Sequence, residues 1–189
     1  MTSEGELRAV TIGELEQRGG VVELADYRPE WPLLYAREAA RIREALGERA
    51  LRLEHVGSTA VPGLIAKPKI DILLVVADSA DESAYVPPLE AAGYVLRIRE
   101  PHWHEHRLFK GPDTDVNVHV FSPDAPEIER LIRFRDHLRA NETDRDLYAR
   151  TKRELAQREW KYMQNYADAK TEVVEGIIAR ARRRVEPAP

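Results

Sequence analysis

The stretch Leu53–Val76, LEHVGSTAVPGLIAKPKIDILLVV, decides the fold because it places two strand patterns on either side of a Gly-Ser turn. Leu51–His55 alternates as a strand, while Ile70–Val76 is almost wholly apolar, which is typical of a central strand covered on both faces. Asp71 interrupts this second strand. Because a buried, unpaired carboxylate is costly, Asp71 needs a cation, hydrogen-bond donors or a proton.

The turn between these strands is a candidate phosphate site. Glycine lets backbone N–H groups approach an anion closely, and an acid on the next strand can hold the accompanying cation. We therefore assign the turn and its neighbours to phosphate binding: Gly57, Ser58, Thr59, His55 and Lys67. The alternatives are that Asp71 pairs with Lys67 or Lys69 at the strand mouth, and that His55 only orients the turn.

The full string EHVGSTAVPGL followed by AKPKID resembles the GrpB family, and the resemblance continues from about Val21 to Arg180 through HRLFKG and DVNVHVFSPDAPEIERLIRFRDHLRAN. It implies an α+β, nucleotidyltransferase-like fold: a mixed β-sheet of about five strands, helices packed on one side, and a helical C-terminal part. The family's own activity is poorly defined, and related domains occur fused to dephospho-CoA kinases. The resemblance thus implies a fold more firmly than a reaction.

In the nucleotidyltransferase pattern a second carboxylate lies two residues after the first, on the same strand face, and here that position is Leu73. Two-metal phosphoryl transfer needs several carboxylates around ions about 3.5–4 Å apart. Glu54, Asp115 and Glu105 are acids on neighbouring strands that could substitute. We expect a single Mg²⁺, held by Asp71 and Glu54, or no stable cation without ligand.

The strand pattern 115–121 places Asn117 and His119 on one face and three valines on the other. We assign Asn117 to nucleotide binding. His119 is a candidate general base, metal ligand or phosphate donor, with a hydrogen-bonded structural role as the alternative. Arg107, by resemblance to the family's Arg-hydrophobic-Phe run, is expected to face the same cleft as a phosphate or carboxylate clamp, or else to pair with Asp71.

His102, His104 and His106 stand at alternate positions. On an extended segment their rings would share a face, which suits a transition metal. Because the stretch follows Pro101, we favour instead a substrate-facing loop in which one histidine works, with a merely solvated loop as the alternative.

The rest of the chain predicts strands first and helices last, in one domain over residues 21–185 behind an N-terminal arm, 1–20, without function. Further strands are expected at 21–24, 94–97, 106–110 and 116–121, the last two joined by Gly111-Pro112-Asp113. Helices are expected at about 29–46, 79–93, 124–138, 143–163 and 168–183.

Composition narrows the classes of function. The 189 residues contain no cysteine, which excludes disulfides and thiolate sites, and the net charge of −4 gives no global attraction to nucleic acid. The basic residues of the C-terminal helices alternate with acids, as on a solvated face. With no apolar run near the roughly 18 residues of a membrane span, and no signal-peptide pattern, we expect a cytoplasmic monomer or weak homo-oligomer.

These features predict a Mg²⁺-assisted, nucleotide-using transferase acting on a small-molecule acceptor. Asp71 would hold the metal, Gly57-Ser58 would hold the phosphates, and His119 or Arg107 would act on the acceptor. One alternative is a non-catalytic nucleotide or phosphoester-binding module that lost the second carboxylate at position 73. The other is an enzyme of the same fold that uses the His-rich loop for different chemistry.

Overall fold

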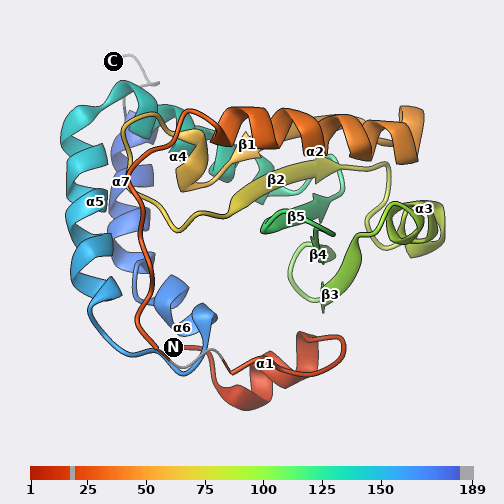
Figure 1. Ribbon diagram of the computed structural model, residues 1–189, viewed down its shortest axis with the longest axis horizontal. Helices are drawn as coiled ribbons and strands as arrows, with labels where there is room; N and C mark the ends of the chain where they lie inside the picture. The colour runs from red at the N-terminus through yellow and green to blue at the C-terminus, as the bar shows by residue number, and fades with distance from the viewer. Residues whose placement is uncertain (18–19, 184–189) are drawn as a thin grey trace.

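The computed structural model describes residues 1–17 and 20–183. Within them the chain forms one five-stranded sheet and seven α-helices (Figure 1). The strands are β1 (Arg52–Val56), β2 (Ile70–Val75), β3 (Val95–Glu100), β4 (His106–Lys110) and β5 (Val116–Phe121). The helices are α1 (Glu4–Val10), α2 (Trp31–Leu46), α3 (Val86–Ala91), α4 (Pro126–Ala140), α5 (Glu142–Ala156), α6 (Met163–Asp168) and α7 (Thr171–Arg183). The expected α+β architecture is confirmed.

The strand order is β1-β2-β5-β4-β3, and only β2 and β5 are parallel neighbours among these strands. Their register aligns Asp71 with Asn117 and Leu73 with His119. The β4–β5 hairpin aligns Lys110 with Asn117, which confirms the turn predicted between these strands. Polar residues far apart in sequence therefore meet on one face of the sheet.

The other face of the sheet carries the main core. Alternate residues of β2 and the three valines of β5 are buried there against α2, which crosses this face from end to end (Figure 1). Ile42 of α2 is fully buried in this contact. The valines thus lie on the core side, as their alternation predicts.

On the polar face, α4 covers only the part of the sheet towards the end of β2. Leu73 and Phe121 are buried there with Ala125 and Ile128 of the α4 region. Leu73, which occupies the expected second-carboxylate position, is fully buried in this contact. The start of β2, with Asp71, is left for a pocket.

Some predicted boundaries are wrong. Residues 21–24 form no strand; just after them, an isolated bridge joins Ala25 to Ala66. The helix expected to reach residue 163 ends at Ala156, where the indole N–H of Trp160 donates to the carbonyl of Leu155 at 2.8 Å and caps the last turn.

Between β2 and β3, the predicted helix over 79–93 is only a 3-10 turn, Glu82–Ala84, followed by the short α3. Within residues 1–17 and 20–183 no helix has the length and apolar character to cross a membrane.

Candidate ligand-binding and catalytic site

The Gly-Ser turn passes directly against Asp71. After β1 the chain turns at Gly57, whose φ of 71° is a left-handed conformation that favours glycine, into the 3-10 turn Ser58–Ala60. A Cβ added at Gly57 would lie 2.5 Å from Oδ2 of Asp71. Glycine is therefore required at this position for two reasons: the backbone angle disfavours other residues, and the Asp71 carboxylate leaves no room for a side chain. Ser58 and Asp71 line one pocket, as the sequence predicts.

His55 and Thr59 hold the turn from behind. The Thr59 hydroxyl donates to the carbonyl of Lys69 at 3.1 Å, so it accepts from Nε2–H of His55 at 3.0 Å. Burial lowers the pKa of His55 to about 4, and its neutral ring stacks on Tyr35 at a centroid distance of 4.8 Å. The structure thus places His55 on the α2 side of the sheet, where it orients the turn.

The floor of the pocket is a polar row supplied by three strands. Asn117 of β5 donates its amide to Oδ1 of Asp71 at 2.8 Å, and its oxygen accepts from Nζ of Lys110 on β4 at 2.5 Å. Nε2 of His119 lies 3.7 Å from the same carboxylate oxygen. The structure therefore brings together Asp71, Asn117 and His119, as predicted.

Asp71 is ionised in this setting. Burial by itself raises its pKa, but the attraction of a protonated His119, the hydrogen bond from Asn117 and the charge of Lys69 outweigh burial, so the pKa lies below its ordinary value. The side chain remains 28% exposed, towards the pocket. A carboxylate that keeps this exposure can contact a ligand.

The pocket has a volume of about 500 Å³, and the N-terminal segment and α6 form part of its wall. Leu7, Thr11 and Leu15 of the N-terminal segment line it, together with Met163 and Tyr166 of α6. The N-terminal segment is joined directly to α6, since Thr2 donates its backbone N–H to Asp168 at 2.6 Å. The prediction that the N-terminal arm lies outside the site is therefore wrong.

Lysines dominate the charge of the pocket. Those lining it come from the segment before β2, from β4, from α5 and from the turn between α6 and α7: Lys67, Lys69, Lys110, Lys152 and Lys170. Burial, with a contribution from Lys69, lowers the pKa of Lys110 to about 8, and burial lowers that of Lys170 to about 8. Burial lowers the pKa of Lys152 to about 6. A bound anion would favour the charged form of all three.

Comparison with known proteins defines the family. A family model described as GrpB protein matches residues 21–180. The chain belongs to the GrpB family. The crystal structure of the conserved protein GrpB from Enterococcus faecalis is similar to it, with a TM-score of 0.74 and 29% identity over 86% of this chain and 98% of that one. The nucleotidyltransferase-like fold expected for GrpB proteins agrees with this similarity.

Two further proteins are related in sequence to this GrpB chain. A UPF0157 protein of Halalkalibacterium halodurans is 62% identical over 179 residues, which cover 95% of this chain and 92% of that protein. A protein named dephospho-CoA kinase from Mycolicibacterium paratuberculosis is 33% identical over 163 residues, covering 72% of this chain and 40% of its own length. The predicted relation to dephospho-CoA kinases is confirmed.

The acids of this GrpB protein do not converge on a metal site. Those expected to support Asp71 are paired elsewhere: Glu54 with Arg135 at 2.8 Å, Asp115 with Lys69, and Glu105 with Arg107 at 3.2 Å. In the described part of the chain, no group of three or more His, Asp or Glu side chains is arranged to hold a metal ion. The carboxylates present thus do not fit a protein-held Mg²⁺ site.

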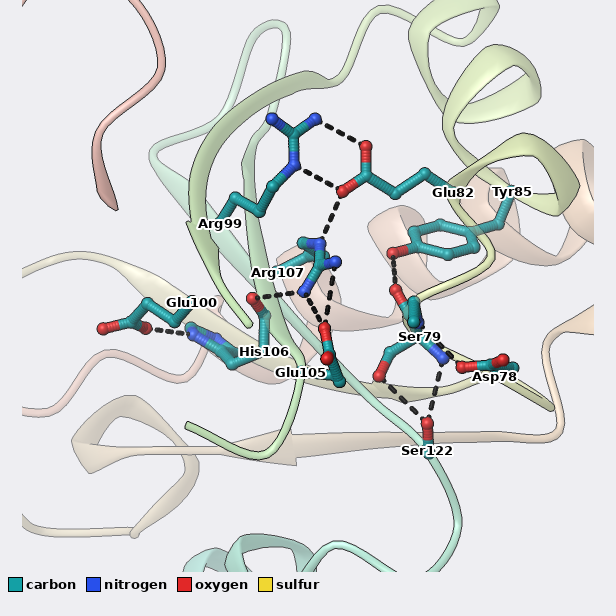
Figure 2. Close-up of polar contacts among 11 residues, drawn as sticks. Asp78, Ser79, Glu82, Tyr85, Arg99, Glu100, Glu105, His106, Arg107 and Ser122 are labelled. Carbon is teal, nitrogen blue, oxygen red and sulfur yellow. Dashed lines mark hydrogen bonds and ion pairs between the residues drawn. The ribbon is translucent and has the colours of Figure 1, made fainter. Parts of the chain in front are cut away.

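Arg107 faces away from the pocket, so the prediction that it lines the cleft with His119 is wrong. Its partner in the β4–β5 register is Val120, which places its side chain on the core side of the sheet. There its Nε donates to Glu82 at 2.6 Å, and the same carboxylate accepts two hydrogen bonds of 2.6 Å from Arg99 (Figure 2). Lys110 is the cation of β4 that faces the pocket.

The three alternate histidines do not share a face, which rules out the three-histidine metal site and agrees with the loop favoured for this segment. His104 and Glu105 have φ values of 55° and 48°, so the segment before β4 is a left-handed turn and not an extended strand. His102 and His104 are exposed on this turn, whereas His106 is buried in β4. Alternate residues share a face only along an extended strand, and the backbone here is not extended.

Sequence reasoning missed three pocket lysines: Lys110, Lys152 and Lys170. Lys110 could have been found by alternation, since the predicted hairpin places it opposite Asn117. Lys152 and Lys170 lie among mixed charges at helical spacing, a pattern typical of a solvated face. No local signal distinguishes these buried lysines from exposed ones.

Proposed function

We propose that this protein binds a nucleotide through its phosphates and transfers the nucleotidyl group to a hydroxyl or amine of a small-molecule acceptor. The observation that carries the proposal is the Asp71–His119 pair, which lies in a pocket lined by five lysines. Lysine ammonium groups suit phosphate oxygens. An adjacent carboxylate and imidazole suit proton transfer from an acceptor.

The size and relatives of the site agree with this substrate class. A cavity of about 500 Å³ lies within the range of small-molecule sites. A relative named dephospho-CoA kinase carries a similar segment, and its name refers to a nucleotide-containing substrate. The proposal assigns no step to Mg²⁺, because the described residues hold no group of three or more His, Asp or Glu side chains arranged for a metal ion.

A second candidate function is a nucleotide or phosphoester-binding module without catalysis. The observation that favours it is Leu73, which is buried in the α4 contact at the position where the transferase pattern has its second carboxylate. Such a protein would keep the lysine pocket and the Gly57 turn while lacking turnover.

Calorimetric titration with the four ribonucleoside triphosphates and with CoA, with and without Mg²⁺, tests binding. Pyrophosphate release in the presence of mixed small alcohols and amines tests turnover. We expect one nucleotide to bind, Lys110→Met to weaken it at least about tenfold, and Asp71→Asn to retain binding but lose turnover. Arg150→Met, which changes an exposed residue of α5, is the matched control. Binding without turnover selects the module, and no binding by any phosphate compound refutes both.

A further inference from the structure

A row of polar side chains runs across the sheet, on the face that carries the pocket. Each of four neighbouring strands contributes one member: Asp71 from β2, His119 from β5, His106 from β4 and Glu100 from β3. Nδ1 of His119 lies 3.1 Å from Nε2 of His106, and Nδ1 of His106 lies 2.6 Å from Oε2 of Glu100. The contact between Glu100 and His106 is drawn in Figure 2.

The order of these contacts determines where the protons lie. Burial lowers the pKa of His106, the Glu100 carboxylate acts in the opposite direction, and a proton on His119 would lower the pKa of His106 further. A neutral His106 carries one proton, which belongs on Nδ1 because the Glu100 carboxylate accepts it. Nε2 of His106 is then an acceptor, so His119 donates from Nδ1. The remaining nitrogen of His119, Nε2, is left without a proton and faces the pocket.

Packing keeps both rings in this arrangement. The rings of His106 and His119 are inclined by only 18°, which suits a hydrogen bond between their edges. His106 is 3% exposed and lies between Trp103 at 5.2 Å and Phe121 at 4.8 Å, measured between ring centroids. Rotation of His106 about χ2, which would put ring carbons where its two nitrogens now lie, is therefore hindered.

We infer that Glu100 and His106 are positioning residues that hold His119 as a general base with a bare Nε2 for the hydroxyl or amine of the acceptor. The inference deepens the proposed function and rests on it for the identity of the reaction. The distance of 3.7 Å from Nε2 to Asp71 is too long for a hydrogen bond, as expected of a nitrogen without a proton. Neither motif reasoning nor family resemblance assigns a role to Glu100.

The proton transfer that this row supports is simple. The O–H or N–H bond of the acceptor breaks as its proton moves to Nε2 of His119, and the acceptor atom forms a bond to the α-phosphorus of the nucleotide. The bond from that phosphorus to the leaving pyrophosphate breaks, and pyrophosphate keeps the electron pair. The imidazolium of His119 is then stabilised by Asp71 on one side and, through His106, by Glu100 on the other. Lys69 and Lys110, the nearby cations, oppose its charge and favour return of the proton.

Nitrogen NMR of the histidine side chains in the ligand-free protein at pH 8 tests the row without any turnover. The wild type should show His106 and His119 as Nδ1–H tautomers. His106→Phe, which keeps a ring between Trp103 and Phe121, should move the proton of His119 towards Nε2, and Glu100→Leu should do the same. Glu100→Gln retains an acceptor oxygen and should restore the wild-type tautomers.

Kinetic measurements then distinguish a positioning role of Glu100 and His106 from a purely structural one. In a turnover assay, His106→Phe and Glu100→Leu should lower kcat by about 10- to 100-fold while nucleotide affinity changes less than about twofold. His102→Phe, in the exposed turn, is the control with unchanged kcat. If His119 is an Nε2–H tautomer or doubly protonated in the wild type, or if its tautomer is the same in all variants, the inference is overturned. Absence of turnover beside the expected tautomers instead counts against the proposed function alone.

Discussion

Two clusters of charge lie on opposite faces of β4 and differ in how their charges are matched. On the core side, Arg107 and Arg99 bind the carboxylate of Glu82, whose pKa falls to about 2 because of Arg99 and then Arg107 (Figure 2). On the pocket side, burial lowers the pKa of Lys110 and Lys170, because the protein supplies too little negative charge to hold them fully protonated.

The difference separates structure from ligand binding. A cation that is paired within the protein contributes to the fold, and removing it leaves a carboxylate without its partner. A buried cation whose pKa is lowered costs stability in the free protein and gains it when an anion binds. The predictions below separate these two behaviours.

The largest effect is expected at Gly57, on which the pocket depends. Gly57→Ala forces a side chain into a left-handed conformation and against Oδ2 of Asp71, so we expect a loss of about 2–4 kcal/mol in unfolding free energy and a fall in Tm of roughly 10 °C. Urea and thermal unfolding measure both. Gly63 has a φ of 77° with its nearest atom at 4.0 Å, so Gly63→Ala should cost only about 1–2 kcal/mol. Equal losses would show that the contact with Asp71 is unimportant.

The next largest effect is expected from substitutions on the two faces of β4, which can be compared directly. Arg107→Met leaves Glu82 with Arg99 alone and Glu105 without its partner, so it should lower the unfolding free energy by about 2–3 kcal/mol without changing nucleotide affinity. Lys110→Met should leave Tm equal or higher while affinity falls at least about tenfold. Unfolding curves and calorimetric titrations on both variants measure this. The opposite pattern would exchange the roles assigned to the two clusters.

A smaller effect is expected from Lys152, which is buried in the pocket wall with its Nζ donating to the carbonyl of Ile65. Its folded pKa of about 6 lies below the ordinary lysine value of about 10.4, so the unfolded chain binds a proton that the folded protein does not. The stability of the wild type should therefore fall as pH decreases from about 10 to 6. Lys152→Met should raise Tm by several degrees at pH 7, and this gain should shrink towards pH 10.

Thermal unfolding of wild type and Lys152→Met from pH 6 to pH 10 measures that trend. Arg150→Met, on the exposed side of the same helix, should show a pH-independent difference from wild type. A gain for Lys152→Met that stays constant with pH would mean that the lysine is charged in the folded protein.

The smallest effect concerns the metal expected at Glu54. Because Glu54 binds Arg135 at 2.8 Å and Arg52 at 3.1 Å, Glu54→Gln should cost at most about 1 kcal/mol of stability and leave nucleotide affinity unchanged, with or without Mg²⁺. Titration calorimetry in the presence of Mg²⁺ or EDTA measures this. A loss of affinity confined to Mg²⁺ would restore Glu54 as a metal ligand.

Part of the site could be predicted because it depends on neighbours in sequence. Alternation along β5 placed Asn117 and His119 on one face, and the apolar strand marked Asp71 as an exception. The turn at Gly57 was also predictable, because its glycine lies between two strand patterns. In each case the physical rule acts within a few residues.

The parts that sequence reasoning got wrong depend on contacts between distant segments. Arg107 was assigned to the pocket although the β4–β5 register places it opposite Val120, on the core side. A loop was expected after Pro101, but the left-handed turn at His104 and the burial of His106 were not. Neither feature follows from the local pattern, because register and backbone direction depend on packing across the sheet.

The sequence by itself determined the five strands, the helical C-terminal part, the glycine turn and the carboxylate beside it, because periodicity and backbone freedom are local properties. Only the tertiary structure decided which charges share a pocket. It joined the N-terminal segment to α6, brought lysines from α5 and the turn between α6 and α7 over Asp71, and aligned Glu100, His106 and His119 across three strands. The physical reason is that burial, which lowers the pKa of these lysines and of His106, arises only when segments far apart in the chain exclude water together.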